Sequence, residues 1–187
     1  LPILADLHPL QDESTVQGAL EIIWRLERLL CEVSGMDRVT LQPGAGSAAI
    51  WTNVSMIRAY HAANGDADQR DEIVTTAFSH PSNAACARTA GYRVITLQPD
   101  PVSGRPTLEA LKAAVNERTA ALLITNPEDT GIYNDEIDEF VRVVHEAGGL
   151  LYYDCANLNA ILGKVRPGDM GFDVIHMNLH KTFSTPH

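Results

Sequence analysis

The sequence predicts an α/β domain of three layers, in which a mainly parallel sheet carries helices on both faces. Apolar runs rich in Val, Ile and Leu alternate with single amphipathic helical segments along the chain, an order typical of right-handed βαβ units. Strands this apolar are typical of parallel sheets that are buried on both faces. With 187 residues, 45% of them hydrophobic, the chain has the size of one domain and can bury a core.

The individual elements follow from residue spacing and end signals along the chain. Gly18–Ser34 has apolar residues at helical spacing, and Gly35 follows as a C-terminal stop. Thr107 is the expected N-cap of a later helix, and Gly91 and Gly148 follow the ends of two others. The expected helices span residues 18–34, 47–61, 82–90, 107–116 and 135–147. The expected strands span residues 39–41, 73–77, 92–97, 120–125, 150–153 and 173–179.

Charge and composition argue against several classes of partner. The chain has 14 Lys and Arg against 24 Asp and Glu, a net charge of −10, so neither a nucleic acid nor an anionic membrane is expected as a partner. No apolar run approaches the roughly 20 residues of a membrane span. The cysteines Cys31, Cys86 and Cys155 are odd in number and lack CxxC spacing, which favours reduced thiols in a cytoplasmic protein. The seven histidines are widely spaced, so no metal site is expected.

Both ends of the sequence look truncated. The chain opens on "LPILADLHPLQ" without an initiator Met, and it stops in "STPH" without a closing element. We therefore expect residues 1–187 to be part of a longer enzyme, with a large domain that is itself incomplete.

A possible anion site follows the first expected strand. Gly44, Ala45, Gly46 and Ser47 open a helix there, and such small residues let an anion approach the free N–H groups and the positive dipole end of a helix. The turn lacks the Gly-Lys-Ser/Thr of a Walker motif and is not a GxGxxG. Alone it is a weak signal for a phosphate site, since such turns are often only tight turns.

Further polar residues follow the other expected strands, at the edge where parallel sheets bind ligands. "FSHPSN" places His80 at this edge, and Thr125 and Asn126 could donate hydrogen bonds into the same crevice. Asp154 ends a strongly apolar strand, where an ionised carboxylate needs a partner. Lys181 follows the last expected strand. We expect these strand ends to line one cleft.

A phosphate cup, a carboxylate, an imidazole and a lysine together suit a phosphorylated aldehyde with a ring nitrogen, namely pyridoxal 5'-phosphate. Lys181 would hold its aldehyde carbon as a Schiff base, and Asp154 would pair with the protonated ring nitrogen. His80 would stack on one face of the ring, and the small Ala156 would lie against the other. These residues are the predicted catalytic and cofactor-binding set, to which Ala45, Gly46, Ser47, Thr125 and His180 are added as cofactor contacts.

Five segments of the chain are distinctive: "LCEVSGMD", "LQPGAGSAA", "TNPEDTG", "HEAGGLLYYDCANLNAILG" and "RPGDMGFDVIHMNLHKTFSTPH". They resemble the glycine cleavage system P-protein, glycine decarboxylase, and especially its catalytic half, which some bacteria carry as a separate second subunit. The resemblance covers essentially the whole chain and is densest in residues 145–187. By this likeness the family continues beyond the last residue into a glycine-rich loop and a small C-terminal domain.

The resemblance implies the large domain of a fold-type-I pyridoxal-phosphate-dependent transferase. It implies decarboxylation of glycine, with transfer of the aminomethyl group to the lipoyl arm of the H-protein, and an oligomer containing the other P-protein subunit. Lys181, Asp154 and His80 match the family's cofactor residues, and Asn157 falls where such enzymes place a hydrogen bond to the ring hydroxyl. Ile50 departs from the pattern, because the family usually has glutamate there.

Two other functions compete with this one. The cofactor residues do not set the reaction, so an aminotransferase or a desulfurase-like enzyme of the same fold would carry a similar set. An aminotransferase needs an arginine for the substrate α-carboxylate, commonly supplied by the C-terminal domain. A non-catalytic scaffold subunit is the second alternative, and Lys181 argues against it because the inactive half of the P-protein is expected to lack that lysine.

Overall fold

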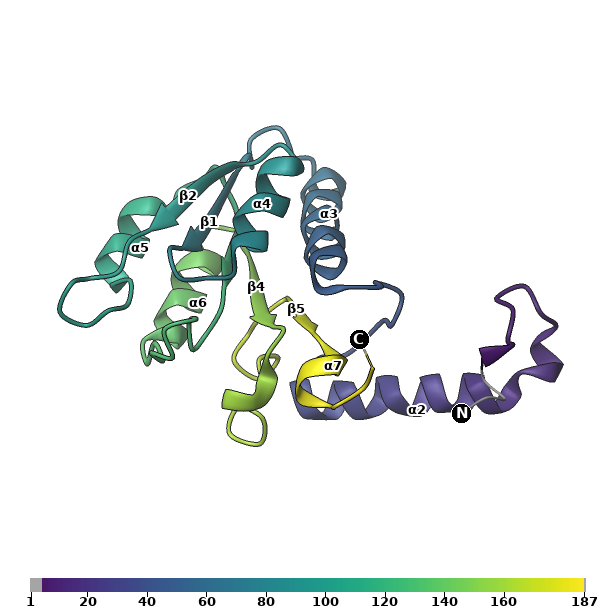
Figure 1. Ribbon diagram of the computed structural model, residues 1–187. Helices are drawn as coiled ribbons and strands as arrows, with labels where there is room; N and C mark the ends of the chain where they lie inside the picture. The colour runs from purple at the N-terminus through teal and green to yellow at the C-terminus, as the bar shows by residue number, and fades with distance from the viewer. Residues whose placement is uncertain (1–4, 187) are drawn as a thin grey trace.

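Five parallel strands form a single sheet in the order β2-β1-β3-β4-β5 (Figure 1). The coordinates are a computed structural model that describes residues 5–186, so residues 1–4 and 187, at the ends predicted to be truncated, lie outside the described residues. The strands are β1 (Glu72–Thr76), β2 (Arg93–Leu97), β3 (Thr119–Ile124), β4 (Leu150–Cys155) and β5 (Val174–Met177). The predicted three-layer, parallel α/β architecture is confirmed.

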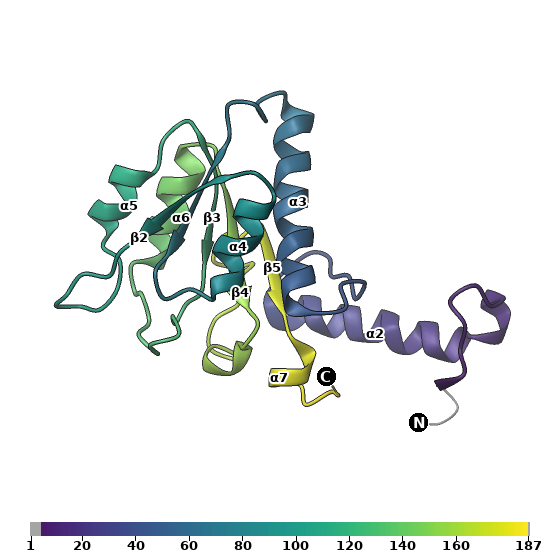
Figure 2. The ribbon, with the colours of Figure 1, turned by 45° about the horizontal axis from the view of Figure 1, so that its top comes forward.

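Helices cover both faces of this sheet (Figures 1 and 2). The helices are η1 (Glu13–Thr15), α2 (Gln17–Ser34), α3 (Gly46–Asn64), α4 (Pro81–Thr89), α5 (Leu108–Ala114), α6 (Ile137–Glu146), η2 (Leu158–Ala160) and α7 (Leu179–Thr182). Thr107 caps α5 through its side chain, as the sequence predicts. Helices α3 and α4 pack on one face of the sheet, and α5 and α6 pack on the other.

The strands bury successive residues on opposite faces, which divides the core in two. Leu122 and Tyr153 contribute to the cluster beneath α5 and α6, whereas Leu123 and Tyr152 contribute to the cluster beneath α3 and α4. All four side chains are at most 1% exposed. This alternation within fully apolar strands is the reason why the central strands show no polar face.

Two predicted elements differ from the structure. Residues 39–41 are not a strand, because β2 and β5 are the edges of the sheet and this segment pairs with neither. The last strand is shorter than predicted, since β5 ends at Met177 and Leu179 begins the short helix α7. Lys181 therefore lies in a helical turn after the strand. Its backbone N–H donates to the carbonyl of Asn178 at 3.0 Å.

Helix α2 projects away from the sheet, and its C-terminal end is the part that lies nearest to it (Figure 2). Leu30 and Ser34 are its buried residues. The N–H of Gly168 donates to the carbonyl of Ser34 at 2.9 Å, which ties that end of α2 to the loop before β5. Within residues 5–186, no helix has both the length and the apolar character needed to cross a membrane.

Candidate active site

A cavity of about 300 Å³ lies at the carboxyl ends of β4 and β5. It is lined by Ala45, Gly46, Ser47, Ile50, His80, Ser82, Asp154, Ala156, His176, Asn178, His180 and Lys181. The predicted convergence of these strand ends is therefore confirmed, because the glycine turn, the imidazole, the carboxylate and the lysine share one cavity. Parallel topology brings them together, since the strand carboxyl ends all meet at one edge of the sheet.

The N-terminus of α3 forms one wall of the cavity. Ala45 is its N-cap in extended conformation, and within residues 5–186 no side chain forms a capping hydrogen bond with the first turn. A Cβ added to Gly46 would lie 3.1 Å from both Nδ2 and Oδ1 of Asn178, so glycine lets the turn pack closely against this side chain. Unsatisfied N–H groups and the positive end of a helix 19 residues long favour an anion here.

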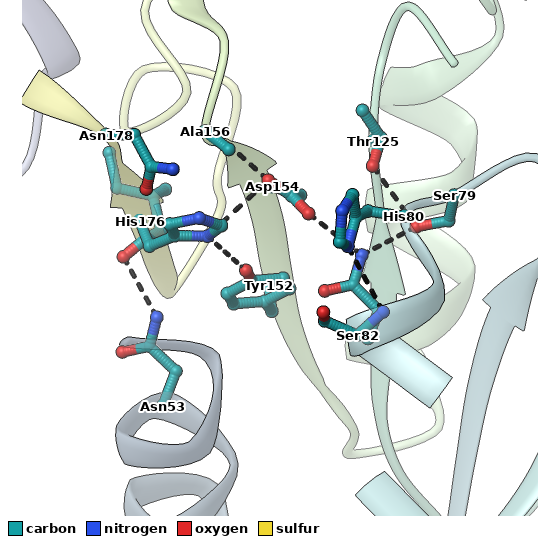
Figure 3. Close-up of polar contacts among 12 residues, drawn as sticks. Asn53, Ser79, His80, Ser82, Thr125, Tyr152, Asp154, Ala156, His176 and Asn178 are labelled. Atoms are coloured by element: carbon teal, nitrogen blue, oxygen red, sulfur yellow. Dashed lines mark hydrogen bonds and ion pairs between the residues drawn. The ribbon is translucent and has the colours of Figure 1, made fainter. Parts of the chain in front are cut away.

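Asp154 is the carboxylate of the cavity, and hydrogen bonds fix both of its oxygens (Figure 3). Its Oδ2 accepts from Nδ2 of Asn83 at 3.0 Å, and its Oδ1 accepts from the N–H of Ala156 at 3.0 Å. Asp154 is buried, with only 4% of the residue exposed. Asn83 also donates to Oγ of Ser79 at 2.6 Å. These contacts hold a buried negative charge in place without a cation bonded to it among the described residues.

A histidine and a tyrosine lie behind this carboxylate. Nδ1 of His176 is 3.5 Å from Oδ1 of Asp154 and forms a short hydrogen bond with the hydroxyl of Tyr152. Burial lowers the pKa of His176, and the nearby Asp154 opposes that shift only in part. Burial likewise raises the pKa of Tyr152 well above its ordinary value, with Asp154 adding to the effect. Both side chains are therefore uncharged near neutral pH.

His80 and Lys181 are the more exposed members of the cavity. Nδ1 of His80 accepts from the N–H of Ser82 at 3.1 Å, so the imidazole is the N-cap of α4. Ser82 in turn lies 3.3 Å from Ser47 through their hydroxyls, which joins the N-termini of α3 and α4. His180 lines the cavity beside Lys181, and its Nε2 is 3.4 Å from Nδ2 of Asn178.

Three residues predicted at this edge do not line the cavity. The hydroxyl of Thr125 is 3.1 Å from that of Ser79 (Figure 3). Ser79 accepts a hydrogen bond from Asn83, which donates to Asp154, so Thr125 reaches the carboxylate only through these two residues. Asn126 faces inward, where its amide exchanges hydrogen bonds with the backbone of Asn134 rather than donating into the cleft. Asn157 is exposed and caps η2. A ligand contact by Thr125 or Asn157 stays a prediction.

Asn83, Tyr152, His176 and Asn178 belong to this site but were not among the predicted residues. Three of them have features in the sequence that could have indicated a role. Asn83 is a polar residue on the buried side of a short helix and is 0% exposed. His176 interrupts an otherwise apolar strand, and Tyr152 lies two residues before Asp154 and so points to the same face. Recognising them required the pairing of β4 with β5.

Cys155 lies next to Asp154 in β4. Cys155 is buried beside Asp154, and burial raises its pKa well above the ordinary value, so its thiol is protonated and packs as a small apolar group. Over residues 5–186, no cluster of three His, Cys, Asp or Glu side chains is arranged to hold a metal ion.

Comparison with known proteins assigns the chain to a family. The sequence model of the DegT/DnrJ/EryC1/StrS aminotransferase family matches residues 15–171. The chain belongs to this family. The match includes the glycine turn, His80 and Asp154 and ends before β5.

Proteins similar to this chain along its whole length carry more specific names. A protein from Thermococcus gammatolerans named "Probable glycine dehydrogenase (decarboxylating) subunit 2" is 59% identical over 186 residues, which is 100% of this chain and 37% of that protein. A protein of the same name from Bacillus cytotoxicus is 53% identical over 186 residues, 100% of this chain and 38% of its own length. The resemblance to the P-protein is confirmed, and the chain spans little more than a third of these relatives.

Solved structures reproduce the fold of this family member. An inhibitor-bound glycine decarboxylase (P-protein) of the glycine cleavage system matches with a TM-score of 0.76 and 22% identity, covering 98% of this chain and 40% of that one. The sphingosine-1-phosphate lyase of Burkholderia pseudomallei matches with a TM-score of 0.73 and 17% identity, covering 93% of this chain and 44% of that one. At these identities the likeness concerns the fold alone.

Proposed function

We propose that this chain is the cofactor-binding part of a glycine decarboxylase that uses pyridoxal 5'-phosphate and transfers the aminomethyl group of glycine to the lipoyl arm of an H-protein. One observation carries the proposal. Lys181, Asp154 and the uncapped N-terminus of α3 line one cavity, in a chain 59% identical along its whole length to a protein named as a glycine dehydrogenase subunit. Residues 1–187 are then part of the large domain of this enzyme.

The residues of the cavity fit such a cofactor by their chemistry. The free amides of α3 at Ala45, Gly46 and Ser47 suit a phosphate, and the glycine allows close approach of the backbone. Asp154 is a buried carboxylate with no cation bonded to it within residues 5–186, so a cationic ring nitrogen would supply its missing partner. The cavity volume of about 300 Å³ lies at the lower end of the range for small-molecule sites, roughly 300–1,000 Å³.

Each side chain then has a distinct task. Lys181 would hold the cofactor covalently through its amine, and the cofactor supplies, when bound, an electron sink for the negative charge that decarboxylation leaves on the α-carbon of glycine. Asp154 would keep the ring nitrogen protonated, because two hydrogen bonds hold its carboxylate in a fixed orientation. His80 and Ala156 would flank the ring, and His180 would support Lys181.

The wall near Ile50 bears on the substrate. Ile50 lines the cavity and is 2% exposed, at a position where the P-protein usually has glutamate. An apolar side chain there makes this wall of the cavity less polar than the family pattern. The exchange assay with glycine therefore tests the substrate as well as the reaction.

The proposed partners are the lipoyl H-protein and the other P-protein subunit, in an oligomeric assembly. The proposed location is the cytoplasm, in line with Cys31, Cys86 and Cys155, none of which forms a disulfide within residues 5–186. The name of the matched family supports one competing function, an aminotransferase on the same fold. The two differ in whether CO₂ is released.

The test is made on the full-length protein with its partner subunit. Addition of pyridoxal 5'-phosphate should produce a visible absorbance band that is lost in Lys181→Ala. With lipoyl H-protein present, the protein should exchange labelled bicarbonate into the carboxylate of glycine. A band without exchange, together with amino transfer to a keto acid, would favour the aminotransferase. The absence of any band would reject both enzymes.

A further inference from the structure

Tyr152, Asp154 and His176 form one row on a single face of the sheet. Asp154 and His176 are register partners in the pairing of β4 with β5, and Tyr152 precedes Asp154 by two residues, so all three side chains point toward α3 and α4. The rings of Tyr152 and His176 are nearly parallel, with an interplanar angle of 10° and centroids 6.0 Å apart. Figure 3 shows the imidazole with contacts to both the hydroxyl of Tyr152 and the carboxylate of Asp154.

The hydrogen-bond chemistry of this row assigns the protons. Nδ1 of His176 faces two oxygens, the Tyr152 hydroxyl in a short contact and Oδ1 of Asp154 at 3.5 Å. The ionised carboxylate can only accept a hydrogen bond, and at 3.5 Å its Oδ1 is at the limit of hydrogen-bond distance from Nδ1. The hydroxyl can donate, and it makes the shorter contact. Tyr152 is therefore the donor, Nδ1 is the acceptor, and the proton of the neutral imidazole is on Nε2.

The charges around His176 agree with this assignment. Asp154 from β4 and, to a smaller extent, a hydrogen bond with Asn178 raise the pKa of the imidazole. Lys181 from α7 and His80 from the turn before α4 lower it. On the α3 side, Asn53 donates to the carbonyl of Ile175 at 3.0 Å and brings no charge. Burial, with 5% of His176 exposed, is the largest of these influences and lowers its pKa.

We propose that Tyr152 and His176 are positioning residues that act through Asp154: the Tyr152 hydroxyl occupies Nδ1 of His176, so the imidazole cannot donate to the carboxylate. Asp154 then keeps its full negative charge for the cationic ring nitrogen of the cofactor. If Nδ1 carried a proton, it would lie on the carboxylate side and compete with the ring nitrogen for the same charge. This inference rests on the proposed function, in which Asp154 meets that nitrogen.

The test compares Tyr152→Phe with Tyr153→Phe in the full-length protein. Tyr153 is the matched control, because it is 1% exposed against 0% for Tyr152 and lies on the opposite face of the sheet. Its substitution removes a hydrogen bond from the Tyr153 hydroxyl to the carbonyl of Asn126. Both substitutions remove one buried hydroxyl. Only Tyr152→Phe frees Nδ1 of His176.

The first readout needs no cofactor. Histidine labelled with ¹⁵N should show His176 with its proton on Nε2 in the wild type and in Tyr153→Phe. In Tyr152→Phe, the Nδ1–H form should appear and His176 should protonate at a higher pH. A wild-type His176 with its proton on Nδ1, or a Tyr152→Phe spectrum identical to that of Tyr153→Phe, would overturn the inference.

The second readout uses pyridoxal 5'-phosphate labelled with ¹⁵N in the ring. In Tyr152→Phe the ring nitrogen should lose its proton at a lower pH than in the wild type, and kcat should fall about fivefold to tenfold, the usual effect of one hydrogen bond in a buried network. The Michaelis constant for glycine should change little. A protonated ring nitrogen whose pH profile is the same in both tyrosine variants contradicts the role of Tyr152 while leaving the proposed function intact. A wild-type protein that binds no cofactor refutes both.

A double variant separates the two residues. In a His176→Leu background the imidazole is gone, so Tyr152→Phe should have no further effect on the ring nitrogen. An effect of the same size with and without His176 would show that Tyr152 does not act through the imidazole. Comparison of the single and double variants therefore shows whether Tyr152 acts on Asp154 through His176, even if His176→Leu alone lowers stability.

Discussion

Nδ2 of Asn83 lies 3.0 Å from Oδ2 of Asp154 and 2.6 Å from Oγ of Ser79, so one buried amide joins α4 to the carboxylate of β4. We expect Asn83→Ala to weaken binding of pyridoxal 5'-phosphate about tenfold, because Asp154 loses the hydrogen bond that fixes Oδ2. Titration of the visible band measures this. The control is Asn53→Ala, which removes another buried amide that does not contact Asp154. Equal loss of affinity in both variants would show that Asn83 acts only through stability.

Asp154→Asn should lower turnover far more than it lowers cofactor affinity. The amide is nearly the same size, and its one oxygen can still accept from Asn83 or from Ala156. It carries no negative charge with which to hold a ring nitrogen protonated. The carbanion formed from glycine then loses its stabilisation, and we expect bicarbonate exchange to fall by at least about a hundredfold. Exchange at the wild-type rate would refute the role of Asp154.

Gly46→Ala should weaken binding of the phosphate group with little effect on folding. The added Cβ would meet the Asn178 amide at 3.1 Å, a distance that forces this flexible side chain, which lines the cavity, to shift. We expect about a tenfold loss of affinity for pyridoxal 5'-phosphate and a melting temperature close to that of the wild type. Gly44→Ala is the matched control, since its Cβ would meet no atom within 4 Å. Equal affinities for the two variants would contradict the tight packing at Gly46.

Gly168→Ala should destabilise the protein strongly. A Cβ at this position would lie 2.1 Å from the carbonyl oxygen of Gly35, a backbone atom that cannot rotate away. The loop before β5 would have to separate from the end of α2 and lose the hydrogen bond from Gly168 to Ser34. We expect the free energy of unfolding to fall by about 2 kcal/mol or more, measured by urea denaturation with Gly44→Ala as the reference. An unchanged denaturation midpoint would show that α2 docks differently.

The sequence was sufficient for those features that depend on local patterns. Apolar strands alternating with single helices predicted the parallel sheet, and the rule that ligands lie at strand carboxyl ends brought Asp154, His80 and Lys181 to one cavity. The sequence was insufficient for features that depend on contacts between segments far apart along the chain. Residues 39–41 have the composition of a strand but pair with neither edge of the sheet. Asn83 and Asp154 are 71 residues apart, and no local pattern records that contact.

Residues close to the site could also be misplaced by a rule that considers only position along the chain. Asn126 follows β3 directly, as a ligand-binding residue would, yet its amide bonds to the backbone of Asn134. The position of a residue after a strand gives its edge of the sheet but not the direction of its side chain. His176 shows the opposite case, because it lies within β5 rather than after it and still reaches the cavity.

Lowering the pH should destabilise the protein through His176. Burial holds its pKa below the ordinary value of 6.5 in the folded state, so the unfolded chain binds a proton first as the pH falls. The stabilisation is thus fully present above about pH 6.5 and is lost progressively below it, with a slope of up to about 1.4 kcal/mol per pH unit from this one group.

Urea denaturation of the wild type and of His176→Leu at pH 7.5 and pH 5.5 measures this contribution. The difference in free energy of unfolding between the two pH values should be smaller in the variant, because it has no imidazole to titrate at this position. Glu128 acts in the opposite sense, since burial raises its pKa from 4.5 and its contribution to stability falls as the pH rises above that value. Because Glu128 is present in both proteins, it cancels in the comparison. Parallel pH dependences for the wild type and His176→Leu would show that His176 takes up its proton equally well in the folded and unfolded states. The assignment of a neutral imidazole to His176 would then be wrong.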